Sequence, residues 1–318
     1  MRMGVIDVGS NTVHLLAVDA HWGAHPLPAS SHKMTLRLSE YTQNDGSISS
    51  YGRDALITFV QDCVEKSEDW GIETLMGFAT SAIRGAPNGD DVLAAVASQA
   101  GVELKVLPGE DESRLTFLAA RRWFGWSAGR LFLVDIGGGS LELASGIDED
   151  PDVALSLPLG AGRVTRERLG GDPAAPALIK AVRKDIRTDI ARVVRDLTKA
   201  GTPDEYVGTS KTIRSLARLC GAAPSDQGPY VRRTLARVDL HDVTKKLARM
   251  TAAQRAELPG VSTHRCHQVL AGALVLEAVM DIVGIEQLTV CPWALREGVI
   301  LQNLDMIPVP GHPYPRTG

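Results

Sequence analysis

Two kinds of hydrophobic pattern alternate along the chain of 318 residues. In one kind, apolar residues recur three and four positions apart, as they do on the buried face of a helix. This pattern predicts helices at 55–70, 90–100, 113–124, 176–199, 211–221, 267–284 and 293–305. In the other kind, short runs of β-branched and apolar residues at 74–80, 102–108, 205–210 and 286–292 predict strands. Strands that alternate with helices predict an α/β protein.

One motif occurs twice: an apolar run, an aspartate, a glycine-containing turn and a second apolar run. The first copy is MGVIDVGSNTVHLLAVDA near the N-terminus, and the second is LFLVDIGGGSLELASG at 131–146. An offset of 128 aligns Asp7 with Asp135, Gly9 with Gly137, Thr12 with Ser140 and Leu15 with Leu143. Residues typical of strands resume at once after each turn, so each copy predicts a strand, a tight turn and a second strand. Two such units, each followed by its own helices and strands, predict two related domains that face each other.

The domain boundary is expected in the sequence GWSAG at 125–129. The first domain then covers residues 1–125, and the second covers 126–292. The last predicted helix, within 293–307, is expected to pack back on the first domain. The segment that follows, 308–318, is rich in proline and is expected to form a loosely ordered tail.

Composition and charge exclude several classes of protein. A net charge of −4, with 44% hydrophobic and 23% charged residues, argues against a protein that coats nucleic acid or an anionic membrane. No long apolar run predicts a membrane span, and Asp7 stands where a secretion signal needs its apolar core. The four cysteines are widely spaced and form no CxxC pair, which disfavours a disulfide framework or a zinc ribbon. We therefore expect a cytoplasmic protein whose partners are neither nucleic acid nor membrane.

The second copy of the motif combines a turn suited to anions with two carboxylates. Glycines let backbone N–H groups approach an anion closely, and the turn consists of Gly137, Gly138, Gly139 and Ser140. Asp135 ends one strand and Glu142 lies in the next, so a hairpin would bring both carboxylates within reach of one Mg²⁺. The alternative is a plain tight hairpin without a ligand. The match between the copies extends the phosphate-binding interpretation to Asp7, Ser10, Asn11 and Thr12.

Two common glycine motifs do not fit this chain. A dinucleotide fingerprint requires GxGxxG at the start of a helix, whereas a strand follows the glycines here. A Walker A loop requires a glycine directly before its lysine, and GTSKT at 208–212 has a serine there.

Three further stretches are placed for phosphate chemistry, and each has a simpler reading. In ATSAIRGA (79–86), Arg84 is either a bidentate phosphate ligand or a surface arginine. In GEDESRLTF, Glu112 stands at a helix start, where a glutamate commonly complements the helix dipole. In GTSKTIRSLA, the run Gly208, Thr209 and Ser210 leads from a strand into a helix N-terminus, where backbone N–H groups can bind an anion. Lys211 either adds positive charge to that anion-binding position or is solvated.

Several stretches of the chain resemble the motifs of the exopolyphosphatase / guanosine pentaphosphate phosphohydrolase (Ppx/GppA) family. They occur in the family's order, as IDVGSNT, ATSAIR, GEDESR, VDIGGGSLEL, GTSKTIRSLA, LPGV, LAGALVLEAVM and ALREGVIL. They span nearly the whole chain, which resembles the short, two-domain form of the family.

The resemblance implies a fold, an activity and a set of roles. The fold is that of the actin/Hsp70/sugar-kinase superfamily, with two ribonuclease-H-like domains facing an interdomain cleft. The activity is Mg²⁺- or Mn²⁺-assisted release of terminal orthophosphate from inorganic polyphosphate. Glu112 corresponds to the family's general base, Arg84 to a phosphate ligand, and Asp135 and Glu142 to ligands of the metal or phosphate. The family is commonly homodimeric.

Other functions stay open at this point. Guanosine pentaphosphate hydrolysis, which belongs to the stringent response, uses the same chemistry with a different leaving group. A regulator that binds polyphosphate or the alarmones pppGpp and ppGpp is a second alternative, but it would not need Glu112, Asp135 and Glu142 together. A sugar kinase would need a nucleotide pocket that the sequence does not reveal. Ser210 and Lys211 depart from the glycine-rich fifth motif of many family members, which puts that phosphate contact in doubt.

Overall fold

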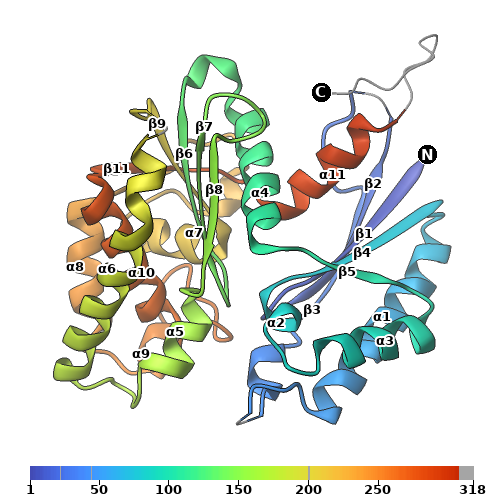
Figure 1. The fold of residues 1–318 in the computed structure, drawn as a ribbon, viewed down its shortest axis with the longest axis horizontal. Helices are drawn as coiled ribbons and strands as arrows, with labels where there is room; N and C mark the ends of the chain where they lie inside the picture. The colour runs from blue at the N-terminus through green and yellow to red at the C-terminus, as the bar shows by residue number, and fades with distance from the viewer. Residues whose placement is uncertain (22, 44, 200, 308–318) are drawn as a thin grey trace. The chain divides into compact units, whose positions relative to one another are not determined.

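The computed structural model of the protein describes residues 1–21, 23–43, 45–199 and 201–307. The chain divides into two compact units, each of which contains one mixed β-sheet (Figure 1). Unit 1 consists of Met1–Leu115 and the chain from Leu295 onward, and unit 2 consists of Thr116–Ala294. The predicted proline-rich tail, 308–318, lies outside the described residues.

Unit 1 contains a five-stranded sheet in the order β3-β2-β1-β4-β5. Its strands are β1 (Arg2–Val8), β2 (Val13–Asp19), β3 (Ser30–Met34), β4 (Thr74–Ala79) and β5 (Leu104–Val106). β1, β2 and β3 pair antiparallel, whereas β1, β4 and β5 pair parallel. The sheet therefore combines an N-terminal meander with parallel strands that are joined by helices.

Helices cover both faces of the unit 1 sheet. They are α1 (Ser50–Asp69), α2 (Ser81–Arg84), α3 (Gly89–Ala100), the start of α4 (Gly109–Phe124), α11 (Leu295–Asp305) and the 3₁₀ turn η1 (Leu38–Tyr41). Successive side chains of a strand point to opposite faces. Ile6 and Val8 accordingly join the cluster that contains α1 and α3, whereas Met3 and Val5 join the cluster that contains α11.

Unit 2 contains a six-stranded sheet in the order β10-β11-β9-β6-β7-β8. Its strands are β6 (Leu131–Ile136), β7 (Leu141–Gly146), β8 (Val153–Leu157), β9 (Glu205–Thr209), β10 (Thr234–Ala236) and β11 (Gln287–Val290). β6, β7 and β8 pair antiparallel, and β6, β9 and β11 pair parallel. β10 closes the edge as an antiparallel partner of β11.

The part of α4 from Thr116 onward covers one face of the unit 2 sheet, and six further described helices cover the other. They are α5 (Ala161–Arg168), α6 (Pro176–Lys199), α7 (Ser210–Leu219), α8 (Arg237–Leu247), α9 (Ala252–Ala256) and α10 (Val269–Val283), with the 3₁₀ turns η2 (Trp126–Ala128) and η3 (Ser225–Gln227). Val134 and Ile136 pack in the cluster of α6 and α10, and Leu131 and Leu133 pack with Phe117 of α4. Eleven of the fifteen residues of α10 are buried, which explains why its sequence is apolar apart from Glu277 and Asp281.

The two sheets repeat one topology, as the sequence motif predicts. In both, the first strand pairs antiparallel with the second and parallel with the fourth. The register pairs Asp7 with His14 in unit 1 and Asp135 with Glu142 in unit 2. The predicted α/β class and the internal repeat are therefore confirmed.

Two of the differences between the predicted and the observed elements have a clear physical reason. Helix α4 begins at Gly109, before the predicted start at residue 113, because its acidic residues occupy the first turn and complement the helix dipole. Strand β3 was missed because its sequence, SSHKM, is mostly polar and lies on a sheet edge. Among the described helices, none is both long and apolar enough to cross a membrane.

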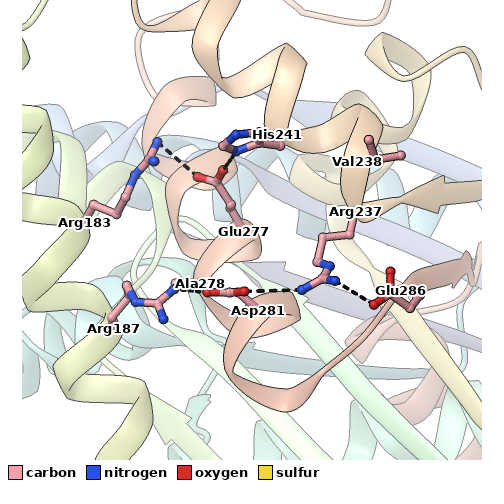
Figure 2. Close-up of a pocket in the computed structure, with 9 residues that line it drawn as sticks. All are labelled: Arg183, Arg187, Arg237, Val238, His241, Glu277, Ala278, Asp281 and Glu286. Carbon is pink, nitrogen blue, oxygen red and sulfur yellow. Dashed lines mark hydrogen bonds and ion pairs between the residues drawn. The ribbon is translucent and has the colours of Figure 1, made fainter.

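Helices α6, α8 and α10 are joined by two sets of ion pairs around a cavity of about 360 Å³ (Figure 2). In the first set, Glu277 of α10 lies 3.1 Å from the Nη2 atom of Arg183 and contacts His241. In the second, Asp281 of α10 pairs with Arg187 and Arg237. Counting the further pair from Arg237 to Glu286, three arginines face three carboxylates. The arginine and carboxylate charges that line this cavity balance, so no surplus positive charge favours an anion there. The ion pairs connect the helices to one another.

Candidate functional site

The turn of unit 1 follows β1 and is closed by its own backbone. The Gly9 amide donates to the Thr12 carbonyl over 3.0 Å, as expected for a tight hairpin turn. Ser10 and Asn11 are buried, and the Ser10 hydroxyl lies 3.3 Å from that of Ser81, which begins α2. The predicted phosphate residues of the first motif copy therefore lie together, and ATSAIR meets them through Ser81.

Asp7, at the end of β1, has an arginine partner that the sequence analysis did not anticipate. The Nε atom of Arg296, from α11, lies 3.0 Å from Asp7 Oδ2. Burial raises the pKa of the Asp7 carboxyl, and the Arg296 charge opposes this effect. Asp7 thus lies beside the predicted phosphate turn as one half of an ion pair.

Arg84 and Glu112 are brought together within unit 1. Arg84 is the last residue of α2, and Glu112 lies in the first turn of α4. The Nη1 atom of Arg84 donates to the Leu107 carbonyl and to the Glu112 carboxylate. The Glu112 side chain is only 7% exposed, whereas that of Arg84 is 28% exposed. The ion pair fixes the position of a buried carboxylate beside a guanidinium that is partly exposed.

The turn of unit 2 follows β6 and repeats the geometry of unit 1. The Gly137 amide donates to the Ser140 carbonyl over 2.9 Å. Within the described part of the chain, the amides of Gly138 and Gly139 have no hydrogen-bond acceptor, so they are available to an anion. The carbonyl oxygens of Gly137 and Gly138 instead accept hydrogen bonds from backbone amides in the first turn of α5, each over 2.9 Å.

Close packing against the start of α5 fixes this turn in place. An added Cβ at Gly160 would lie 2.3 Å from the Gly139 carbonyl carbon, and one at Gly162 would lie 2.9 Å from the Gly138 oxygen. No side chain fits at the first position without a backbone shift. Gly160 and Gly162, in the sequence LGAGR, are therefore supporting residues that the sequence analysis missed.

Asp135 and Glu142 face each other across β6 and β7, and both are buried. The Thr209 hydroxyl donates to Asp135 Oδ2, and the Ser156 hydroxyl donates to Glu142 Oε1 over 3.0 Å. Burial raises the pKa of Asp135, while the Thr209 hydrogen bond and the charges of Arg214 and Arg265 oppose the rise. Neither arginine was assigned from the sequence, although both lie close enough to act on Asp135 electrostatically.

The GTSK segment leads from β9 into α7. Gly208 lies inside β9, where its carbonyl accepts the Cys291 amide over 2.9 Å. Thr209 points to Asp135, and Ser210 adopts a φ of 75°, in the left-handed region that favours glycine. The Ser210 hydroxyl accepts the Ile213 amide over 3.3 Å. Thr209 therefore lies beside Asp135 and Ser210 begins α7, whereas Gly208 belongs to the sheet.

The paired carboxylates fit a hard divalent cation. Among the described residues, no group of three or more His, Cys, Asp or Glu side chains could hold a metal ion. Mg²⁺ nonetheless binds through one or two carboxylates and keeps several waters, which substrate phosphates can replace. Two buried carboxylates that face each other across the hairpin match that requirement, whereas Zn²⁺ would need more ligands.

The chain is similar to known proteins in both sequence and fold. The model of the Ppx/GppA phosphatase family matches residues 17–306. The chain is 56% identical to exopolyphosphatase 1 of Mycobacterium tuberculosis over 305 residues, which cover 96% of this chain and 89% of that protein. It is 54% identical to exopolyphosphatase 1 of Mycobacterium leprae, over 96% of this chain and 90% of that protein. The crystal structure of an exopolyphosphatase from Cytophaga hutchinsonii has the same fold, with a TM-score of 0.86 at 21% identity over 97% of this chain and 99% of that one.

Proposed function

The chain belongs to the Ppx/GppA phosphatase family, and on this premise we propose that it is an exopolyphosphatase, a hydrolase that releases terminal orthophosphate from inorganic polyphosphate. The observation that carries the proposal is the 56% identity to exopolyphosphatase 1 over 96% of the chain. The overall reaction adds water across a terminal P–O–P anhydride and yields orthophosphate and a chain shortened by one phosphate.

We propose that Asp135 and Glu142 hold Mg²⁺, or Mn²⁺ in its place. Both are oxygen donors, they share one face of the hairpin, and Ser156 and Thr209 orient them. A divalent ion bound there supplies positive charge that offsets the charge of the phosphate chain.

The phosphate itself is assigned to the glycine turns. The Gly138 and Gly139 amides, with Gly137 and Ser140 beside them, provide uncharged donors without a Cβ in the way. Thr209 and Ser210, at the start of α7, add a helix N-terminus. The turn at Ser10, Asn11 and Thr12 of unit 1 is assigned as a second phosphate-binding turn.

Glu112 is assigned as the general base. Its carboxylate orients a water molecule and takes one proton from it as the water oxygen attacks the terminal phosphorus. The bond to the bridging oxygen then breaks, and the shortened chain leaves as an anion. Arg84 fixes the position of Glu112 through Nη1, and the rest of its guanidinium is directed to phosphate. Positioning and charge stabilisation carry most of the barrier reduction in such phosphoryl transfers.

The decisive experiment measures orthophosphate release from polyphosphates of defined length, with and without Mg²⁺. Guanosine pentaphosphate (pppGpp) is assayed in parallel, because hydrolysis of this stringent-response alarmone uses the same chemistry with a different leaving group. We expect Mg²⁺-dependent release that is faster from polyphosphate. Faster release from pppGpp would assign the alarmone as substrate, and tight binding of either ligand without release would indicate a regulator.

Two further properties are proposed for this enzyme. A cytoplasmic location is supported by the four free cysteines, Cys63, Cys220, Cys266 and Cys291, since an oxidising compartment favours disulfides. A homodimer is the expected assembly, and light scattering of the purified chain tests it. A mass equal to that of one chain would reject the dimer.

A further inference from the structure

Arg296 bridges the two residues that flank the unit 1 turn. Its Nε atom lies 3.0 Å from Asp7 Oδ2, and its Nη1 atom lies 2.7 Å from His14 Nδ1. Asp7 and His14 are directly opposite each other on β1 and β2. One guanidinium from α11 therefore reaches across the same strand pair that carries the turn.

The pleat of the sheet explains why the three side chains meet. Asp7 points to the same face of the sheet as Met3 and Val5, and His14 to the same face as Leu16 and Val18, because alternate residues share a face. All four apolar residues pack in the cluster that also contains Val299, Ile300 and Leu304 of α11. Both polar side chains therefore point to the side of the sheet that α11 covers.

The internal repeat shows how the residues that Arg296 contacts differ from their counterparts in unit 2. The offset that aligns Asp7 with Asp135 also aligns His14 with Glu142. Unit 2 thus presents two carboxylates, which suit a divalent cation, whereas unit 1 presents one carboxylate and one imidazole. Nδ1 of His14 accepts from Arg296, which requires an uncharged ring, and burial together with the Arg296 charge lowers the pKa of His14 to about 4. A single positive charge balances the unit 1 pair, and Arg296 supplies it.

Arg296 retains donors that Asp7 and His14 do not use. A guanidinium has five N–H donors in a planar fork that matches phosphate geometry. Nη2 has no acceptor among the described residues, and the side chain is 30% exposed. The group is held next to the turn at Gly9–Thr12 by its contacts with the residues on either side of that turn.

We propose that Arg296 binds a phosphate of the polyphosphate chain at the unit 1 turn and serves there as a built-in counterpart of the metal ion in unit 2. This inference rests on the proposed function and adds to it a substrate-binding residue contributed by the C-terminal helix. Asp7 then positions Arg296 and does not contact the anion itself. The contact acts on affinity for the chain and leaves the attack on phosphorus to Glu112.

The competing explanation is that Arg296 only fastens α11 to the sheet. The two explanations differ in what the folded protein does. A structural arginine affects the free energy of unfolding, but once the protein is folded its removal does not alter substrate affinity. A phosphate-binding arginine changes KM and the dissociation constant even at temperatures far below unfolding.

The test compares Arg296→Gln and Arg296→Lys with wild type, using polyphosphate of one defined length. KM and kcat are measured, and binding is measured directly by calorimetry in a Glu112→Gln background. We expect Arg296→Gln to raise KM and Kd by about 10- to 100-fold, the usual range for a hydrogen bond to a charged group, with kcat changed by less than about 3-fold. Arg296→Lys keeps the charge but loses the fork, so a smaller rise of about 3- to 10-fold is expected.

Each outcome decides the matter. Unchanged KM and Kd in a folded Arg296→Gln protein would overturn the inference, as would a loss of kcat at constant KM. If Arg296→Gln does not fold, the Arg296→Lys variant provides the test. Wild-type substrate affinity in that variant would equally reject a contact between the Arg296 guanidinium and phosphate. Failure of wild type to release phosphate from polyphosphate rejects the proposed function instead, so the two failures are distinguishable.

Discussion

Arg84 and Glu112 form an ion pair inside unit 1, across a sequence separation of 28 residues. Because Arg84 ends α2 and Glu112 lies in the first turn of α4, two segments that follow neighbouring strands of one sheet meet at this pair. The pair holds the proposed base in a fixed position and leaves the Arg84 side chain partly exposed.

Removal of this base has a direct consequence for turnover. Glu112→Gln keeps the size of the side chain and can still accept a hydrogen bond from Arg84, but it cannot take a proton from water. We expect kcat for phosphate release to fall by about 10²- to 10⁴-fold with an unchanged circular dichroism spectrum. Glu110→Gln is the matched control, since Glu110 is 59% exposed and pairs with Arg114, and it should keep wild-type turnover. Near-normal turnover in Glu112→Gln would reject the assignment.

The hydroxyl of Ser156 donates a hydrogen bond to Glu142, the proposed metal ligand. Ser156→Ala removes the 3.0 Å hydrogen bond to Glu142 Oε1 and leaves that oxygen less well oriented. We expect the Mg²⁺ concentration for half-maximal activity to rise by about 10- to 100-fold, with activity regained at high Mg²⁺. Ser98→Ala, on the exposed side of α3, should leave the Mg²⁺ titration unchanged. A titration that does not move in Ser156→Ala would argue against Glu142 as a metal ligand.

Gly160 is predicted to tolerate no side chain at all. The Cβ of Gly160→Ala would lie 2.3 Å from the backbone of Gly139, so the turn or the start of α5 must shift. We expect phosphate release to fall by at least about 10-fold and the free energy of unfolding to fall by about 1–3 kcal/mol. Gly170→Ala offers a matched control, because its Cβ would meet only Leu178 at 4.0 Å. Equal behaviour of the two variants in activity and urea-unfolding assays would show that the turn does not need this close packing.

The left-handed backbone at Ser210 predicts an unusual order of stabilities. Ser210→Ala loses the hydroxyl that accepts the Ile213 amide and keeps the unfavourable Cβ at a φ of 75°. Ser210→Gly loses the same hydroxyl but relieves the strain, which is worth about 1–2 kcal/mol for a residue with a Cβ. We expect the glycine variant to be more stable than the alanine variant by about that amount in urea unfolding. The reverse order would mean that this residue is not left-handed in solution.

His14 predicts a dependence of stability on pH. Its pKa is lowered from 6.5 to about 4 in the folded protein, so between these values the unfolded chain binds a proton that the folded chain does not. The free energy of unfolding should therefore fall as pH drops from about 6.5 to 4, by up to about 3 kcal/mol, and the effect should vanish above that window.

His14→Gln keeps a neutral acceptor for Arg296 and should weaken this pH dependence in urea unfolding. His25→Gln, at an exposed position, should retain it in full. Parallel curves for wild type and His14→Gln would contradict the shifted pKa.

The fold was largely predictable because its signals are local. The aspartate, glycine turn and resumed strand appear twice with one offset, and the likeness to solved Ppx/GppA proteins confirms the expected actin-like fold. The polar edge strand β3 was missed because it carries little of the apolar pattern by which strands are predicted. The contacts of Asp7 were also beyond prediction, since Arg296 is 289 residues away and no periodicity links the two. The alignment of His14 with Glu142 was available in the same offset, and it was the signal that could have pointed to an asymmetry between the turns.

The return of α11 to unit 1 has a consequence for the order in which the protein can be completed during synthesis. Val299, Ile300 and Leu304 belong to one apolar cluster of unit 1, so unit 1 lacks part of its interior until α11 has been translated. Unit 2 is continuous in sequence and has all of its strands before α11 emerges from the ribosome. We therefore expect unit 2 to reach its native state before unit 1, the reverse of the usual N-terminal-first order. Limited proteolysis of ribosome-bound nascent chains should find Thr116–Ala294 protected before Met1–Leu115.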